Sequence, residues 1–179
     1  MIQRPAIDDL IRKHGFRDYK WIDPRRIVVA QWVRMKCLFG CPNYGRIASC
    51  PPNTPPVLEC ERFFREYSDG ILLHFTKAVP HPEDRHAWTR ELDLALLQVE
   101  RDVFLAGHPK AFLLSVSSCH LCPECPAERA ACLNPKASRP APEGMAIDVF
   151  STVRQYGYPI DVLADVGQEM NRYGILLIE

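Results

Sequence analysis

The chain has 179 residues, with 22 acidic and 22 basic side chains, so its formal net charge is zero. Balanced charge without blocks of one sign gives no support for a role in binding nucleic acid or a membrane surface. No apolar run reaches the roughly 20 residues of a membrane helix, and the first residues have no apolar signal core. We therefore expect a cytoplasmic protein in a reducing compartment, with one cysteine-rich, metal-binding α/β domain over residues 1–179.

Helices and strands are predicted to alternate along the chain. Hydrophobic spacing predicts helices over 5–16, 57–67, 83–105, 145–156 and 160–170. Aliphatic and β-branched runs predict strands over 26–35, 70–75, 111–116 and 174–178. This alternation favours an α/β fold, with a mixed or parallel sheet of about four to five strands and flanking helices. Two cysteine-rich loops, 37–56 and 119–142, each follow a predicted strand, so they could lie near each other at one edge of the sheet.

Eight cysteines in a reduced chain favour metal binding or catalysis over a disulfide framework. The sharper set is Cys119-x2-Cys122-x2-Cys125-x6-Cys132. Three cysteines at two consecutive x2 spacings are typical of 4Fe–4S ligation in bacterial ferredoxins. Zinc sites instead use two C-x2-C pairs separated by a longer stretch, which makes zinc the alternative metal. The fourth cysteine lies close enough along the chain for a local four-ligand site.

The other set is Cys37-x3-Cys41-x8-Cys50, on a loop rich in Pro, Gly and Asn, followed by Cys60. Cys60 falls within a predicted helix, where it is either a fourth ligand or a half-buried helix cysteine. Without Cys60, this site has three thiolates and an open position, which favours catalysis over electron transfer. Disulfides between Cys37 and Cys41, or between Cys50 and Cys60, are a further alternative.

Other polar residues near these loops carry weaker signals. His120 is expected to be a solvent-facing or hydrogen-bonded loop residue, and His74 a satisfied core histidine. Tyr44 either shields a cluster or packs on the core, and Arg139 either offsets cluster charge or is exposed to solvent. No Ser-His-Asp or H-E-x-x-H pattern and no phosphate-binding glycine loop is present, so hydrolysis and nucleotide binding have no local support.

Several motifs flank the cysteines: Cys37-x3-Cys41-Pro42-x-Tyr44-Gly45, Cys50-Pro51-Pro52, the second cysteine set, Arg139-Pro140, Ile147-Asp148-Val149 and Tyr173-Gly174. Together, over roughly residues 20–179, they resemble a bacterial and archaeal family of predicted metal-binding proteins, a domain of unknown function. The resemblance implies metal binding of iron–sulfur type, mostly in anaerobes, and no established reaction. It covers seven cysteines and leaves out Cys60. Ala146 stands where the family pattern leads us to expect glycine.

We expect an iron–sulfur protein that holds one or two 4Fe–4S clusters and passes electrons to a partner protein. The alternatives are an enzyme or cluster-handling factor that uses an open iron, and a structural zinc protein with an interaction role. No nucleic-acid or membrane partner is expected, and a homodimer is compatible with a domain of this size. The candidate ligands are Cys37, Cys41, Cys50, Cys60, Cys119, Cys122, Cys125 and Cys132.

Overall fold

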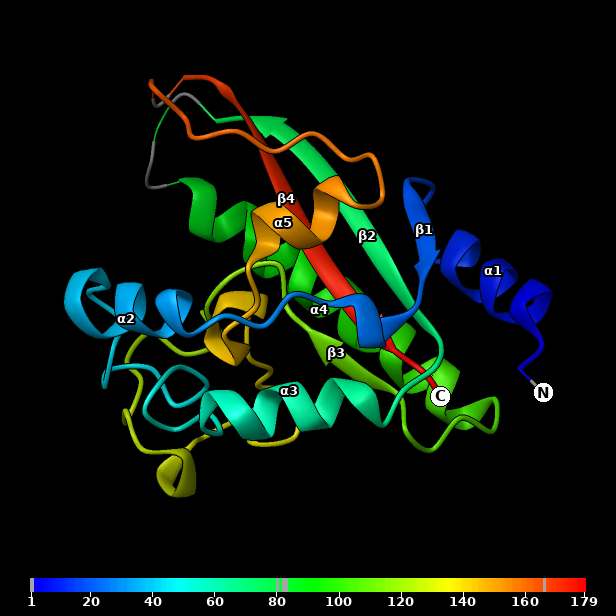
Figure 1. Ribbon diagram of the computed structural model, residues 1–179, viewed down its shortest axis with the longest axis horizontal. Helices are drawn as coiled ribbons and strands as arrows, with labels where there is room; N and C mark the ends of the chain where they lie inside the picture. The colour runs from blue at the N-terminus through cyan, green and yellow to red at the C-terminus, as the bar shows by residue number, and fades with distance from the viewer. Residues whose placement is uncertain (1, 80, 82–83, 166) are drawn as a thin grey trace.

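The protein is built on a four-stranded sheet, seen in a computed structural model that describes residues 2–79, 81, 84–165 and 167–179. The strands are β1 (Tyr19–Ile22), β2 (Gly70–Ala78), β3 (Phe112–Leu114) and β4 (Glu169–Leu177). Their order is β1-β2-β4-β3, and every neighbouring pair is antiparallel (Figure 1). The predicted α/β sheet is confirmed, but the expected mixed or parallel pairing is wrong. The C-terminal strand β4 pairs between β2 and β3, so these two strands share a direction without touching.

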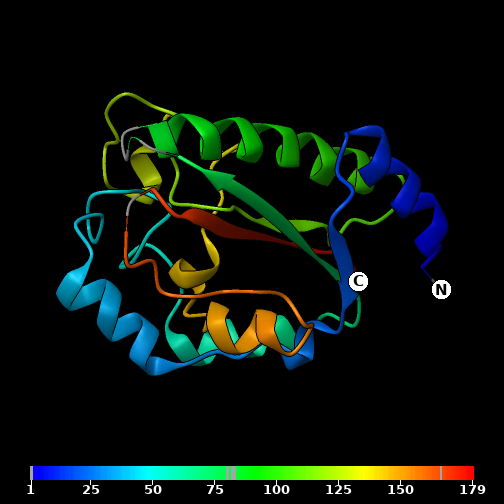
Figure 2. The same cartoon turned by 90° about the horizontal axis from the view of Figure 1, so that it is seen from above.

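The helices cover both faces of the sheet, as the view from above shows (Figure 2). Helices α1 (Arg4–Lys13) and α4 (Asp84–Leu105) pack on one face, where Ile7, Ile11 and Val99 join an apolar core. Helices α2 (Gln31–Gly40), α3 (Val57–Arg65) and α5 (Val149–Arg154) lie on the other side of the sheet. Short 3-10 helices span Pro24–Arg26, Arg129–Ala131 and Pro142–Met145. No helix in the described ranges is both long and apolar enough to cross a bilayer.

Two predicted elements are wrong. Residues 26–35 are not a strand, because only Val29 forms a bridge, with Ile147, before α2 begins at Gln31. The helix formers Gln31, Arg34, Met35 and Lys36 outweigh the β-branched run that precedes them. The predicted helix over 160–170 is also wrong, because the described residues there are irregular until β4 begins at Glu169.

Other predictions differ from the structure in their limits. The sequence reading missed the four-residue strand β1. The helix predicted over 145–156 is shortened to α5, and Glu83, at the predicted start of the long helix, lies outside the described residues. The turn before α5 passes through Ala146, whose φ is 59°, in the left-handed region that favours glycine. This conformation accounts for the glycine expected there from the family pattern.

The turn at Ala146 connects the segment before α2 to the segment before α5. The Ala30 N–H donates to the Ala146 carbonyl at 2.9 Å, and the Asp148 N–H donates to the Val28 carbonyl at 2.8 Å. The Asp148 side chain then caps α5 by accepting from the Ser151 N–H at 2.9 Å. These bonds fix where α2 starts, and therefore where its cysteine-bearing end lies.

Candidate metal centre

The end of α2 presents the first two cysteines. Cys37 lies in the last turn of the helix, and Cys41 follows its final residue, with the Cys41 N–H donating to the Cys37 carbonyl at 3.3 Å. Although Cys41 is already extended, both thiols lie in the wall of the same cavity beside the helix end. The first cysteine loop therefore follows a helix and not the predicted strand. Only the second loop follows a strand, β3.

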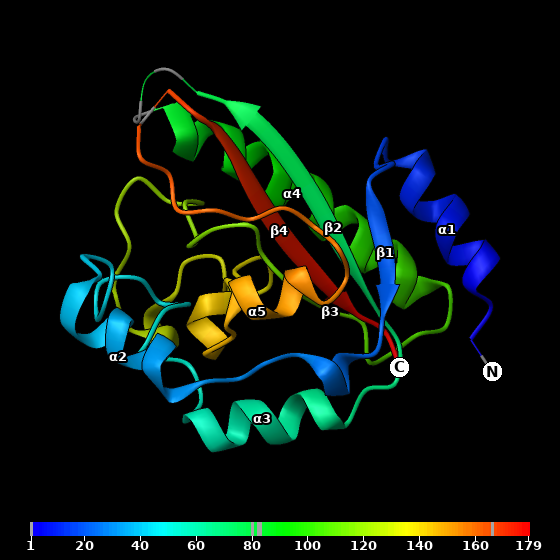
Figure 3. The same ribbon diagram turned by 45° about the horizontal axis from the view of Figure 1, so that its top comes forward.

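The two cysteine loops lie side by side (Figure 3). The Asn43 side-chain amide donates to the Ser118 hydroxyl at 3.0 Å, and that of Asn53 donates to the Ala127 carbonyl at 2.7 Å. Closer to the thiols, the backbone N–H of Ala48 donates to the Sγ of Cys125 at 3.3 Å. The neighbouring position of the loops, which the sequence only suggested, is thus confirmed by direct contacts.

Four thiols surround one small cavity of about 100 Å³, which we call the four-thiol cavity. Its cysteines are Cys119, Cys122, Cys125 and Cys132, all partly buried. Besides the Ala48 N–H, the Asn134 amide donates to the Cys122 Sγ at 3.0 Å. The hydroxyl of Ser138, which also lines the cavity, is buried and has no hydrogen-bond partner in the described part of the chain. The walls therefore offer sulfur ligands together with hydrogen-bond donors to those sulfur atoms.

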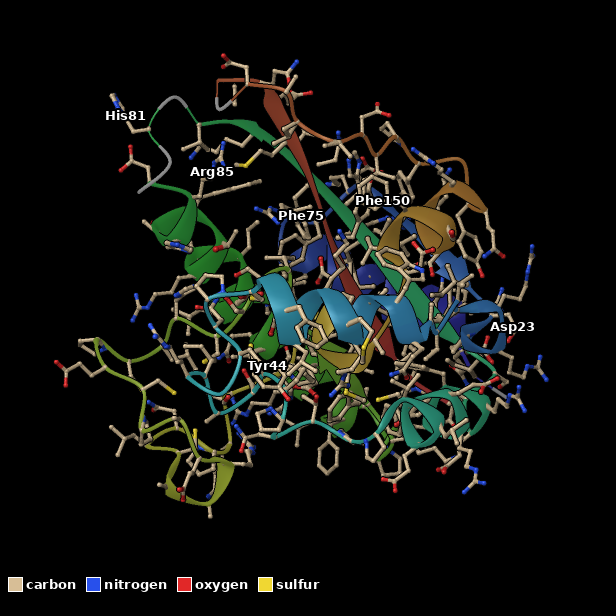
Figure 4. All side chains as sticks on the ribbon, turned by 60° about the vertical axis from the view of Figure 1, so that its left-hand side comes forward. Asp23, Tyr44, Phe75, His81, Arg85 and Phe150 are labelled. Atoms are coloured by element: carbon tan, nitrogen blue, oxygen red, sulfur yellow. The ribbon has the colours of Figure 1, made fainter. Side chains whose placement is uncertain are left out.

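Three further thiols, Cys37, Cys41 and Cys50, line a second cavity of about 530 Å³, which we call the three-thiol cavity. Tyr44 is also in its wall, beside the end of α2 (Figure 4). Burial, together with negative charge on cysteines of both sets, raises the pKa of the Cys50 thiol to about 12. Burial also raises the pKa of Cys37. Cys50 is thus within electrostatic reach of Cys41 in its own set and of Cys125 in the other set.

Cys60 lies apart from both cavities. Its side chain is fully buried in the core between α3 and the sheet, with Phe64 and Leu72 in the same cluster. Its Sγ donates to the Pro55 carbonyl at 3.4 Å, and burial raises the pKa of the thiol. Cys60 is in the wall of neither the three-thiol nor the four-thiol cavity.

No disulfide joins any of the eight cysteines, all of which are described residues, so the disulfide alternative finds no counterpart. In the described ranges, no three His, Cys, Asp or Glu side chains form a ready-made site for a single metal ion. The thiols surround spaces larger than one ion: a single water-sized atom needs roughly 10–15 Å³.

The flanking polar residues take defined places. His120 lies in the walls of both thiol cavities, with its Nε2 3.1 Å from the Ser118 Oγ, and so is hydrogen-bonded. His74 is a core histidine as predicted, hydrogen-bonded to Asp18 and Asn171. Arg139 fits neither of its expected roles, because its guanidinium pairs with the buried Glu100 at 2.9 Å.

The sequence reading missed two candidate residues, Ser138 and Arg172. Ser138 is notable for its buried, unpartnered hydroxyl, and Arg172 lines the three-thiol cavity from β4. The signal for Arg172 was weak: it stands with Asn171 just before the Tyr173-Gly174 motif, at the point where an apolar strand was predicted to start.

Comparison with known proteins gives one match. The family described as "Predicted metal-binding protein (DUF2284)" matches residues 20–178, which include all eight cysteines. No curated protein and no solved structure matches the chain. The match covers the segments that build both thiol cavities.

Proposed function

Because the chain belongs to the DUF2284 family of predicted metal-binding proteins, we propose that it is a redox protein with two iron–sulfur clusters. The four-thiol cavity is the site of a closed 4Fe–4S cluster. Cys37, Cys41 and Cys50 would hold a second cluster in the three-thiol cavity, and three thiolates would leave one of its irons without a cysteine ligand. This proposal combines two of the functions expected from the sequence: electron transfer, and chemistry at an open iron.

The observation that carries the proposal is the division of the thiols. Four line one cavity, three line the other, and Cys60 is in the core. The C-x2-C-x2-C spacing belongs to the four-thiol cavity, as in ferredoxin-type sites. A volume of about 100 Å³ exceeds by several times the roughly 10–15 Å³ of one water-sized atom, which favours a multi-atom cluster over a single ion.

The residues around the four-thiol cavity suit a cluster in their chemistry. When bound, such a cluster would supply reversible one-electron transfer. The chain provides sulfur ligands, and it also provides the Ala48 N–H and the Asn134 amide as donors to sulfur. The orphaned Ser138 hydroxyl is a third donor in the same wall. Donors of this kind stabilise negative charge on sulfur and so help set a cluster's potential.

Cys50 gives the two sites a short connection. Besides burial, negative charge on Cys37 and Cys41 of its own set raises the pKa of the Cys50 thiol. Negative charge on Cys119 and Cys125 of the other set has the same effect. A ligand of one cluster that lies near the thiols of the other would suit electron passage between the two sites. The four-thiol site would then exchange electrons with a partner, and the three-thiol site would use them.

A protein electron carrier is the partner that we propose. Large apolar side chains are exposed within two residues of the cysteines: Phe39 is 81% exposed and Leu133 is 70% exposed. Exposed apolar groups beside a redox centre are the kind of surface on which transient partners dock.

The test is the cofactor content of anaerobically purified protein. We expect iron and acid-labile sulfide in equal amounts, about eight of each per chain if both sites hold four irons. A broad absorbance band at about 400 nm should bleach on reduction with dithionite. A colourless protein loaded with zinc would contradict the proposal and would favour the structural zinc alternative.

A further inference from the structure

A second large cavity adjoins the three-thiol cavity. It has a volume of about 520 Å³, and we call it the apolar cavity. The two cavities have wall residues in common: Cys37, Cys41, Val116, Glu143 and Arg172. The thiols of Cys37 and Cys41, at the end of α2, therefore lie in the walls of both cavities.

Apolar side chains in the walls of the apolar cavity come from several segments. α2 contributes Trp32, α5 contributes Phe150, β4 contributes Met170, and the irregular segment before β4 contributes Val162. Figure 4 shows Phe150 on α5. Met170 is buried, whereas Trp32 is 51% exposed, so the cavity has an apolar floor and an open rim. Its volume is within the range of about 300–1,000 Å³ typical of small-molecule sites.

Arg172 is the polar group that stands out in this wall. Its Nε is buried without a hydrogen-bond partner in the described ranges. Its Nη2 lies 4.0 Å from the Met170 Sδ, which is a weak acceptor. No ion pair joins Arg172 to any described acidic residue, and the Asp161 carboxylate in the same wall pairs with Arg154 at 3.7 Å. A guanidinium that lacks an acidic partner in the described part of the chain is a favourable place for an anion, so an anionic ligand in this cavity would supply the partner that Arg172 lacks.

The geometry points to a binding site for an organic carboxylate with an apolar body. The carboxylate pairs with the Arg172 guanidinium, whose planar donors match two carboxylate oxygens. The body of the ligand lies against Phe150, Met170 and Trp32. Because Arg172 lines both cavities, the bound acid lies beside Cys37 and Cys41. Binding itself does not depend on the metal, whereas the placing of the acid next to an open iron rests on the proposed function.

The test is calorimetric titration of anaerobically purified protein with hexanoate. The same protein is titrated with 1-hexanol, which keeps the apolar body, and with acetate, which keeps the charge. We expect hexanoate to bind with a dissociation constant below about 1 mM and both comparison compounds to bind at least tenfold more weakly. Arg172→Gln should weaken hexanoate binding at least tenfold and leave 1-hexanol binding within about twofold.

Arg62→Gln is the matched control, because it removes an exposed arginine of α3 that lines neither cavity. It should leave hexanoate binding unchanged. Arg172→Lys keeps the charge and should retain part of the affinity, which separates loss of the anion partner from loss of folding. Equal effects of Arg172→Gln and Arg62→Gln, or no saturable hexanoate binding up to about 10 mM, would overturn the inference.

Iron is measured in the same samples, so the two proposals fail separately. Protein that contains iron and sulfide but binds no hexanoate contradicts the carboxylate site alone. Protein that binds hexanoate through Arg172 but contains no iron supports the site and contradicts the iron–sulfur function.

Discussion

Replacing Cys60 by alanine should leave the iron content unchanged while weakening the fold. The Cys60 Sγ is fully buried among core side chains and lines neither thiol cavity. Removing one buried sulfur atom forfeits a transfer free energy close to the roughly 0.8 kcal/mol of a methylene, plus the cost of the cavity left behind. We therefore expect the free energy of unfolding to fall by about 1–2 kcal/mol. For a chain of this length that corresponds to a melting temperature lower by about 2–8 °C.

Cys50→Ala is the matched control, because Cys50 is also buried but lies in the wall of the three-thiol cavity. The assay is iron and sulfide analysis of both variants after anaerobic purification, with circular dichroism to confirm folding. Cys50→Ala should lose about half of the iron, if each site holds four. Loss of iron from a folded Cys60→Ala protein would refute the division of the cysteines into four, three and one.

Three further predictions concern single residues elsewhere in the structure. Burial raises the pKa of Asp93 to about 7, so its contribution to stability is complete below pH 3.8 and is lost as the pH rises through about 7. In urea unfolding, the free energy of unfolding of Asp93→Asn relative to the wild type should rise by about 1.4 kcal/mol between pH 6 and pH 8. A difference in unfolding free energy that is the same at both pH values would contradict this titration of Asp93. Gly174→Ala should cost about 1–3 kcal/mol in the same assay, because a Cβ would lie 3.2 Å from Leu96 Cδ1 and Val116 Cγ1; a neutral effect would show that these side chains yield. Ser138→Ala should lower the potential of the four-thiol cluster by roughly 60 mV for each 1.4 kcal/mol of hydrogen bonding lost from the reduced state, and an unchanged potential in a redox titration would exclude the hydroxyl as a donor to sulfur.

Elements with strong local patterns could be predicted from the sequence. The apolar spacing of α4 and the aliphatic run of β2 both indicated the observed element. The pairing of the sheet could not be predicted, because it depends on β4 inserting between two strands that α4 joins. The strand predicted before Cys37 is wrong because only its first part is extended, at Ile27 and Val29, whereas a helix begins at Gln31.

The grouping of the cysteines into two sets could largely be predicted from their spacing. Three cysteines at x2 intervals must lie close together, and Cys132, expected as the fourth of the set, lines the same cavity. The burial of Cys60 in the core could not be predicted, because only the packing of α3 against the sheet decides which side of that helix is buried. Arg172 and Ser138 were missed for a similar reason. Their interest lies in buried polar atoms without partners, and this is a property of the folded chain.

The most direct test of the two-site account is anomalous X-ray scattering at the iron edge from anaerobically grown crystals. The account predicts one iron peak among Cys119, Cys122, Cys125 and Cys132 and a second among Cys37, Cys41 and Cys50. It also predicts no peak at Cys60. Peaks that appear only at the zinc edge, or an iron peak ligated by Cys60, would contradict it.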